Sequence, residues 1–169
     1  MDLSPYQPWI VFTHVAAAFA FIAAHGASMA VFFRLRRERD RTKLTTLLDL
    51  SSYTLGVLYV AFLVLLLAGI LAGIVGGWWT NGRLWLWIAL VVLVVVVGLM
   101  YGLMTTSYGK LRQALGIATP SDAKKGIVLE PAPDEVLEAL LTSSRPTIGA
   151  LTGIAGLLVI IWLMVVKPF

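Results

Sequence analysis

The chain has 169 residues, of which 59% are hydrophobic and only 13% are charged, whereas an average soluble domain carries about 25% charged residues. It has no cysteine, which excludes disulfides, zinc–thiolate sites, iron–sulfur clusters and thiolate-ligated haem. The net charge of +4 is better explained by basic loops that orient membrane helices than by nucleic-acid binding, so we expect no nucleic-acid partner.

The hydrophobic residues are concentrated in four long runs. Each run is long enough to cross a hydrocarbon layer of about 30 Å at a rise of about 1.5 Å per residue. The predicted spans cover residues 9–33, 52–75, 84–106 and 147–166. The fold class that follows is all-α: a polytopic membrane protein, a single domain over 1–169, folded in the lipid bilayer as an antiparallel bundle of four transmembrane helices.

The connections differ in length and character. No basic residue precedes the first run, so the start of the chain does not resemble a cleaved signal peptide. A densely charged segment, 34–43, follows the first span, and a Gly- and Asn-containing turn, 76–83, follows the second. The predicted loop 107–146 is the only sizeable polar region. Within it, 134–141 has acidic residues first and apolar ones after, which predicts a short amphipathic helix along the membrane surface.

The distribution of Lys and Arg predicts the orientation. The first connection carries six and the third carries five of the thirteen, so these two connections are expected on the cytoplasmic side. Both termini then lie on the non-cytoplasmic side of a multi-pass protein of the cell inner (plasma) membrane. Six tryptophans fall near the predicted outer boundary, where we interpret them as interfacial anchors: Trp9, Trp78, Trp79, Trp85, Trp87 and Trp162.

Small residues recur at every fourth position in the spans, as in Gly69/Gly73, Gly98/Gly102 and Gly149/Gly153. Such spacing lets helix backbones approach closely, which predicts a tight bundle without identifying the neighbours.

Two histidines, His14 and His25, stand inside the first span, and no Asp, Glu, Lys or Arg lies in the interior of any span. Polar groups in hydrocarbon are costly, so these two are the candidate site residues. At about 100° per residue, their separation brings both rings to one face within about 20°, at depths about 16.5 Å apart. This arrangement is typical of a membrane cytochrome that binds b-type haem at two depths.

The second axial ligand has to be a different residue type or a second copy of the chain. Met29, Met100 and Met104 lie near the expected depth of His25, and Met164 lies near that of His14, so His/Met ligation is one solution. The other solution is a parallel homodimer in which each histidine meets its own copy. Copper is an alternative metal for His14 and His25, because imidazole and thioether ligands suit it. Simple hydrogen bonding between helices, or a proton relay, would also explain the histidines.

The segment Trp9-Ile10-Val11-Phe12-Thr13-His14-Val15, followed by Ala24-His25-Gly26, resembles the first helix of an uncharacterised bacterial family of four-span integral membrane proteins. That family is loosely similar to the copper-resistance D (CopD-like) membrane domain. The resemblance implies a four-helix membrane bundle that handles haem or copper, with His14 and His25 as the residues that carry over.

No phosphate-binding loop, His-Glu-x-x-His, Gly-x-Ser-x-Gly or dinucleotide-binding motif occurs in the sequence, so nothing indicates a hydrolase or a nucleotide-driven pump. Whether the chain is an enzyme stays open. The first hypothesis is a small membrane redox protein that binds b-type haem and passes electrons within the bilayer. The alternatives are a non-catalytic accessory or scaffold subunit of a larger membrane complex, and a copper-handling membrane protein.

Overall fold

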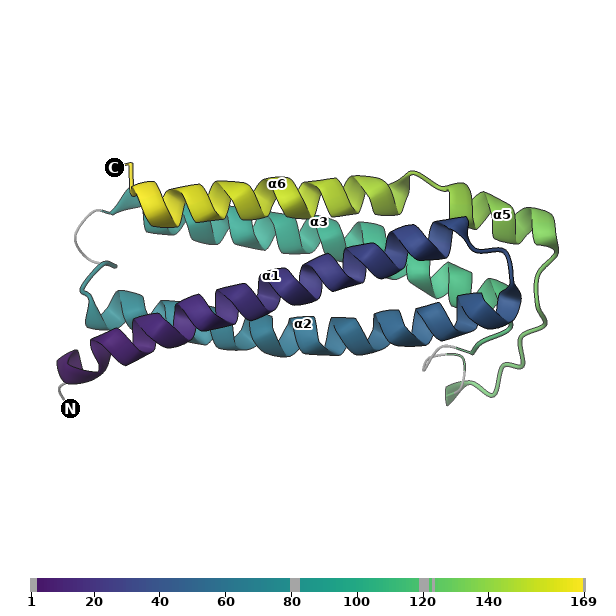
Figure 1. The fold of residues 1–169 in the computed structure, drawn as a ribbon, viewed down its shortest axis with the longest axis horizontal. Helices are drawn as coiled ribbons and strands as arrows, with labels where there is room; N and C mark the ends of the chain where they lie inside the picture. The colour runs from purple at the N-terminus through teal and green to yellow at the C-terminus, as the bar shows by residue number, and fades with distance from the viewer. Residues whose placement is uncertain (1–2, 80–82, 119–121, 123, 169) are drawn as a thin grey trace.

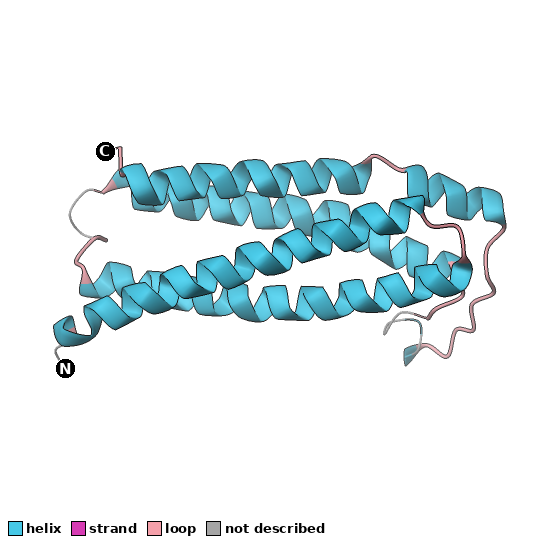
Figure 2. Cartoon of the chain, in the orientation of Figure 1, coloured by secondary structure: helices cyan, strands magenta, loops and turns pink. Residues whose placement is uncertain are grey.

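A computed structural model describes residues 3–79, 83–118, 122 and 124–168. Within this part of the chain the regular elements are all helices (Figure 2). The long ones are α1 (Gln7–Arg37), α2 (Arg41–Val75), α3 (Leu84–Ala114) and α6 (Arg145–Val166). A 3-10 turn, η1 (Ser4–Tyr6), precedes α1, and α5 (Asp134–Thr142) is a short helix before α6. All four long helices are long and apolar enough to cross a membrane.

Each long helix runs antiparallel to the long helix before it in the chain. The start of α1 and the end of α6 therefore lie at the same end of the bundle (Figure 1). They form two pairs: α1 packs along α2, and α3 packs along α6, whereas contact between the pairs is slight. We call these the α1/α2 pair and the α3/α6 pair. This looseness between the pairs leaves room for the cavity that is described below.

Three helices extend beyond the predicted spans. α1 continues to Arg37, α2 already begins at Arg41, and α3 ends at Ala114, so the charged connection 34–43 shrinks to three residues. Asp40 begins α2, because its carboxylate accepts hydrogen bonds from the backbone N–H groups of the next turn. Hydropathy detects only the part of a helix that is apolar throughout, so these amphipathic ends were wrongly assigned to loops.

The amphipathic helix predicted at 134–141 is confirmed as α5, but its surroundings differ from the expectation. Instead of only lying along a surface, α5 buries its apolar face in a core at one end of the bundle, between α1, α2 and α3. That core consists of Leu35, Leu44, Leu48, Leu111, Ala114, Leu137 and Leu141. The end of the bundle that carries α5 is called the basic end below.

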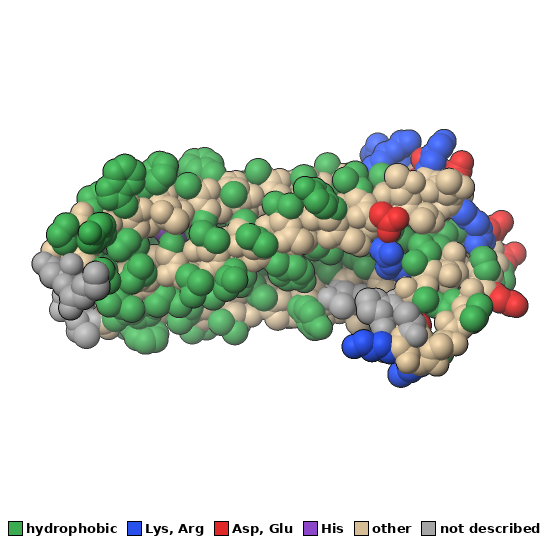
Figure 3. Space-filling model, turned by 90° about the horizontal axis from the view of Figure 1, so that it is seen from below, with side chains coloured by type: hydrophobic (Ala, Val, Ile, Leu, Met, Phe, Trp, Pro, Cys, Tyr) green, Lys and Arg blue, Asp and Glu red, His purple; other side chains and the backbone are tan. Residues whose placement is uncertain are grey.

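Charged side chains gather at the basic end, while hydrophobic side chains cover the rest of the face seen in Figure 3. Arg36 joins α1 to α5 and α6 there. Its guanidinium donates hydrogen bonds to the carbonyls of Leu141 and Thr142, at 3.1 Å each, and to the hydroxyl of Thr147 at 2.6 Å. The two carbonyls stand at the end of α5, so Arg36 satisfies acceptors that the helix itself leaves open.

Not every predicted small-residue stripe packs inside the chain. Gly149 lies against Leu103 and Met104 of α3, and Gly156 lies directly against Val96, so α6 uses its glycines to approach α3. By contrast, a methyl group at Gly98 or Gly102 would meet nothing within 4 Å. The stripe of α3 therefore faces away from the described neighbours, contrary to the expectation. Glycine spacing shows where approach is allowed, but not whether a partner uses it.

Candidate functional site

Both histidines are carried by α1, which is one unbroken helix from Gln7 to Arg37. His14 is partly buried and His25 is buried, with 7% of its surface exposed. Their rings contact different helices: His14 meets α2, whereas His25 meets α6. The two histidines therefore have separate environments at two depths of the bundle.

The His14 ring is fixed by the backbone of α2. Its Nδ1 lies 2.9 Å from the carbonyl oxygen of Leu65, which can only accept, so Nδ1 carries the proton and donates. In a neutral imidazole the lone pair then belongs to Nε2. Proteins hold the ring of a metal-ligating histidine by the same second-nitrogen hydrogen bond to a carbonyl.

Gly69 provides the space for this ring. A Cβ atom at Gly69 would stand 2.8 Å from Cε1 and 2.9 Å from Nδ1 of His14, which is closer than real Cβ contacts. Part of the predicted small-residue stripe of α2 thus accommodates an imidazole and not only a helix backbone. Leu65 and Gly69 were not predicted as site residues.

A cavity of about 540 Å³ lies between the two helix pairs, and we call it the interpair cavity. His14 from α1 and Met164 from α6 both line it. Its walls are otherwise mostly apolar and come from all four long helices, including Val11, Val15, Phe21, Phe62, Leu66, Leu90, Leu93, Leu157 and Ile161. His14 and Met164, which were predicted to lie at the same depth, therefore line the same, mostly apolar cavity.

Aromatic rings and one lysine surround the end of this cavity near the α2–α3 connection. The Trp78 and Trp85 rings are 6.0 Å apart, and Nζ of Lys167 lies 5.1 Å from the first and 5.6 Å from the second. Trp85 is only 2% exposed, so it is part of the packing and not a surface anchor as expected. Trp9, at 70% exposed, is placed as an anchor would be. The predicted turn residues Thr80, Asn81 and Gly82 lie outside the described residues.

His25 lies where α1 meets the α3/α6 pair. Its ring is parallel to that of Phe21, at 6.2 Å between centroids and 8° between planes. Its Nε2 is buried, and among the described residues it has no hydrogen-bond partner. Nε2 of His25 stands 3.1 Å, and Sδ of Met100 2.8 Å, from the position that a Cβ of Gly153 would take. An imidazole nitrogen and a thioether sulfur therefore converge at this glycine.

The two remaining candidate methionines have other surroundings. Met104 packs on Gly149, and Met29 is partly buried one turn beyond His25 on the same helix. His25 itself is not among the residues that line the interpair cavity. Of the predicted combinations, the structure brings together His14 with Met164 around a cavity, and places His25 and Met100 against the same glycine, Gly153.

The described residues contain no group of three or more His, Asp or Glu side chains that could hold a metal ion. No carboxylate site for a hard cation is therefore found among them. The candidate metal ligands are the imidazole nitrogens of the histidines and the thioether sulfurs of the methionines.

No protein-family model matches the chain, and no curated protein or solved structure shows significant similarity to it. The resemblance to the four-span and copper-resistance D families stays a prediction.

Proposed function

We propose that this chain is a small membrane redox protein that holds one b-type haem in the interpair cavity and passes electrons within the bilayer. His14 would hold the haem through Nε2, and Met164, on the opposite helix pair, would be the candidate for a second protein ligand. The observation that carries the proposal is the hydrogen bond from His14 Nδ1 to the Leu65 carbonyl, which leaves the lone pair on Nε2 of a residue that lines a mostly apolar cavity.

The cavity suits such a group in size and chemistry. Its volume of about 540 Å³ lies within the range of about 300–1,000 Å³ that is typical of small-molecule and cofactor sites. Apolar walls would exclude water from the ring, and Lys167 offers a cation to a carboxylate at the cavity's edge. When bound, the haem supplies one-electron chemistry, and the chain's residues hold, orient and shield it.

The second haem that the sequence suggested at His25 is not part of this proposal, because that ring packs against Gly153 and does not line the cavity. The homodimer with histidines paired across a two-fold axis is also set aside. His25 is buried within its own chain, and the partly buried ring of His14 is hydrogen-bonded to Leu65 of the same chain.

For the membrane arrangement, we propose a multi-pass protein of the inner (plasma) membrane with the basic end in the cytoplasm. The support is the concentration of Lys and Arg in the connections 38–40 and 115–144 and in the helix ends beside them. Both termini and the interpair cavity then lie toward the opposite side.

A reduced-minus-oxidised absorption spectrum of the purified protein, expressed with haem supplied, tests the proposal. We expect the α-band of b-type haem in the wild type and in His25→Ala, a shifted band in Met164→Leu, and no band in His14→Ala. A wild-type protein without any haem band would contradict it.

A second candidate, copper binding, is favoured by the convergence of His25 Nε2 and Met100 Sδ. A nitrogen–sulfur donor pair is chemically suited to reduced copper. Metal analysis of the protein purified without chelators tests this site. A copper content above background in the wild type that is lower in both His25→Ala and Met100→Leu supports it. Copper at background, or equal copper in the variants, rules it out.

A further inference from the structure

A second cavity, of about 500 Å³, lies at the basic end, between the last turns of α3, the helix α5 and the start of α6. It is separate from the interpair cavity and shares no lining residue with it. Two basic residues line it, Lys110 from α3 and Arg145 from α6. We propose that this cavity is a binding site for a phosphate group, of the kind carried by an anionic phospholipid.

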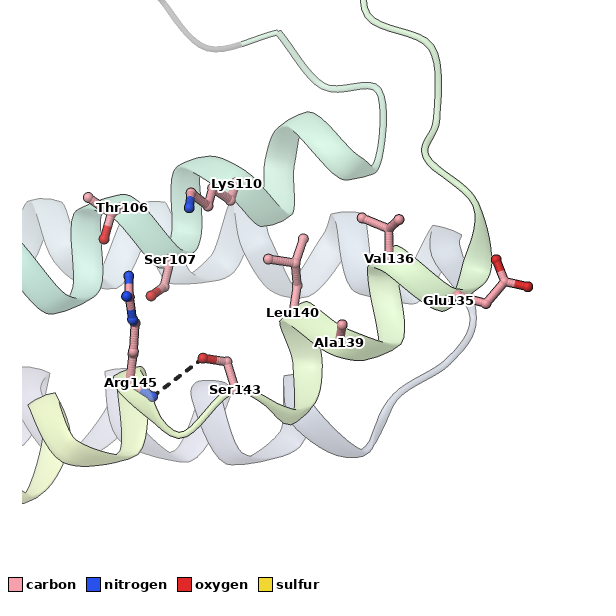
Figure 4. Close-up of a pocket in the computed structure, with 9 residues that line it drawn as sticks. All are labelled: Thr106, Ser107, Lys110, Glu135, Val136, Ala139, Leu140, Ser143 and Arg145. Atoms are coloured by element: carbon pink, nitrogen blue, oxygen red, sulfur yellow. Dashed lines mark hydrogen bonds between the residues drawn. The ribbon is translucent and has the colours of Figure 1, made fainter.

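Arg145 extends from α6 toward α3, the helix that carries Lys110. Figure 4 shows the Arg145 guanidinium extending from the start of α6 toward α3, beside the turn that carries Lys110. The one acidic residue of the lining, Glu135, points its carboxylate away from them in the same view. The cavity therefore has a basic side chain on α3 and another on α6.

Neither cation is neutralised by the chain's own carboxylates. The ion pairs at this end join Arg34 with Glu38, Arg39 with Glu138, Arg41 with Asp134, Lys43 with Asp40 and Arg112 with Asp49. Within the described ranges, no ion pair includes Lys110 or Arg145. Two cations that line one cavity and have no ion-pair partner repel each other, and an anion between them relieves that repulsion.

The hydroxyl groups of the cavity divide into two kinds. Thr106 and Ser107 each donate to a carbonyl of their own helix, at 2.9 Å and 2.8 Å, so they shape the wall. The oxygen of Ser143 instead accepts a hydrogen bond from the backbone N–H of Arg145, at 3.4 Å, which leaves its proton free to donate. A phosphate group accepts hydrogen bonds only, so Lys110, Arg145 and Ser143 form a matching set of donors.

The apolar part of the lining favours a phospholipid over a small soluble phosphate compound. Val136, Ala139 and Leu140 of α5 form one wall, and α3 and α6 both lead from the cavity directly into their long apolar segments. A phosphate bound here would thus stand at the boundary of the predicted hydrocarbon layer, with apolar surface beside it for an acyl chain.

Thermal unfolding of the detergent-solubilised protein, followed by tryptophan fluorescence, tests the site. It is titrated with a short-chain phosphatidylglycerol, a phosphatidylcholine of the same chain length, or inorganic phosphate. We expect saturable stabilisation by phosphatidylglycerol and none by phosphatidylcholine. In the double variant Lys110→Gln/Arg145→Gln the apparent affinity should fall about tenfold or more.

The matched control is Lys124→Gln/Lys125→Gln, which removes two exposed cations that do not line the cavity and should bind as the wild type does. If the double variant does not fold, two single variants replace it. We expect weakened binding in Ser143→Ala and largely retained binding in the charge-conserving Arg145→Lys. Saturable binding of inorganic phosphate with the same variant dependence would assign the site to a soluble phosphate compound. An equal response of the cavity variants and the control, or no response to any probe, would overturn the proposal.

Discussion

At the scale of single residues, His14 and His25 differ although they share a helix and an amino-acid type. The His14 ring is held by the Leu65 carbonyl and borders a cavity, whereas His25 is packed between Phe21, Met100 and Gly153 with a buried, unpartnered nitrogen. Burial of an unpaired polar atom costs free energy, so the environment of His25 is maintained against a penalty. Of the two, His14 lines the interpair cavity and His25 does not.

The fit of His14 against Gly69 gives a direct prediction. In Gly69→Ala the added methyl would stand 2.8 Å from the ring, so the imidazole has to move and its bond to Leu65 is lost. We expect a loss of about 1–3 kcal/mol of stability and weaker haem retention. Gly56→Ala on the same helix is the control, because its methyl meets nothing within 4 Å. Thermal midpoints that are equal in the two variants would contradict this reading.

Glu38, in the short connection between α1 and α2, gives a pH prediction. Hydrogen bonds from the backbone N–H groups of Arg39, at 3.1 Å, and Asp40, at 3.3 Å, lower the pKa of its carboxyl, with smaller help from Lys43 and Arg34. Because the folded-state pKa is lowered, the stabilisation is present above the ordinary glutamate pKa and is lost as the pH falls through the folded-state value.

The variant Glu38→Gln should therefore be less stable than the wild type at neutral pH, and the difference should shrink as the medium is acidified through this range. Thermal midpoints measured across pH for both proteins check this. A difference that stays constant with pH would show that the charge of Glu38 plays no part.

At the scale of elements, hydropathy predicted the four long helices, and the acidic-then-apolar pattern predicted α5. The pairing of α1 with α2 and of α3 with α6 could not be derived in this way, because the small-residue stripes of the spans permit several arrangements. The outward-facing Gly98 shows that the pattern is not specific. Likewise the carbonyl of Leu65 gives no sequence signal, since every residue has one. The interpair cavity depends on how the helices pack, so it could not be predicted from the sequence.

Arg36 joins three elements at the basic end, which gives a prediction for the bundle's assembly. Arg36→Ala removes the hydrogen bonds to Leu141, Thr142 and Thr147, so we expect a loss of about 1–3 kcal/mol and earlier opening of α5. Arg37→Ala is the control, because Arg37 is exposed and carries the same charge. Thermal unfolding and proteolysis of the α5 region check the result, and identical behaviour of the two variants would contradict it.

At the scale of the whole molecule, the two ends of the bundle have different chemistry. One end gathers tryptophans around an apolar cavity with His14, and the other gathers cations, ion pairs and the core formed by α5. Such polarity along the helix axes is what a fixed orientation in a membrane requires.

The orientation can be tested by labelling, because the chain contains no native cysteine. In intact cells, a membrane-impermeant maleimide should label Ser4→Cys, and should label Lys125→Cys only after the membrane is opened. The basic residues are retained on the side from which they are inserted, which places Lys125 in the cytoplasm. The reverse pattern would invert the proposed topology, and labelling of both sites in intact cells would contradict four membrane crossings.

The central claim is that His14 Nε2 is the ligand atom of a group bound between the helix pairs, and haem titration into the purified apoprotein tests it most directly. We predict that the wild type and His25→Ala saturate with a single haem per chain and the spectrum of a histidine-ligated b-type haem, while His14→Ala does not. Haem binding that is indifferent to His14 would contradict the claim. A wild-type protein that binds no haem and co-purifies with a larger complex would instead identify an accessory subunit.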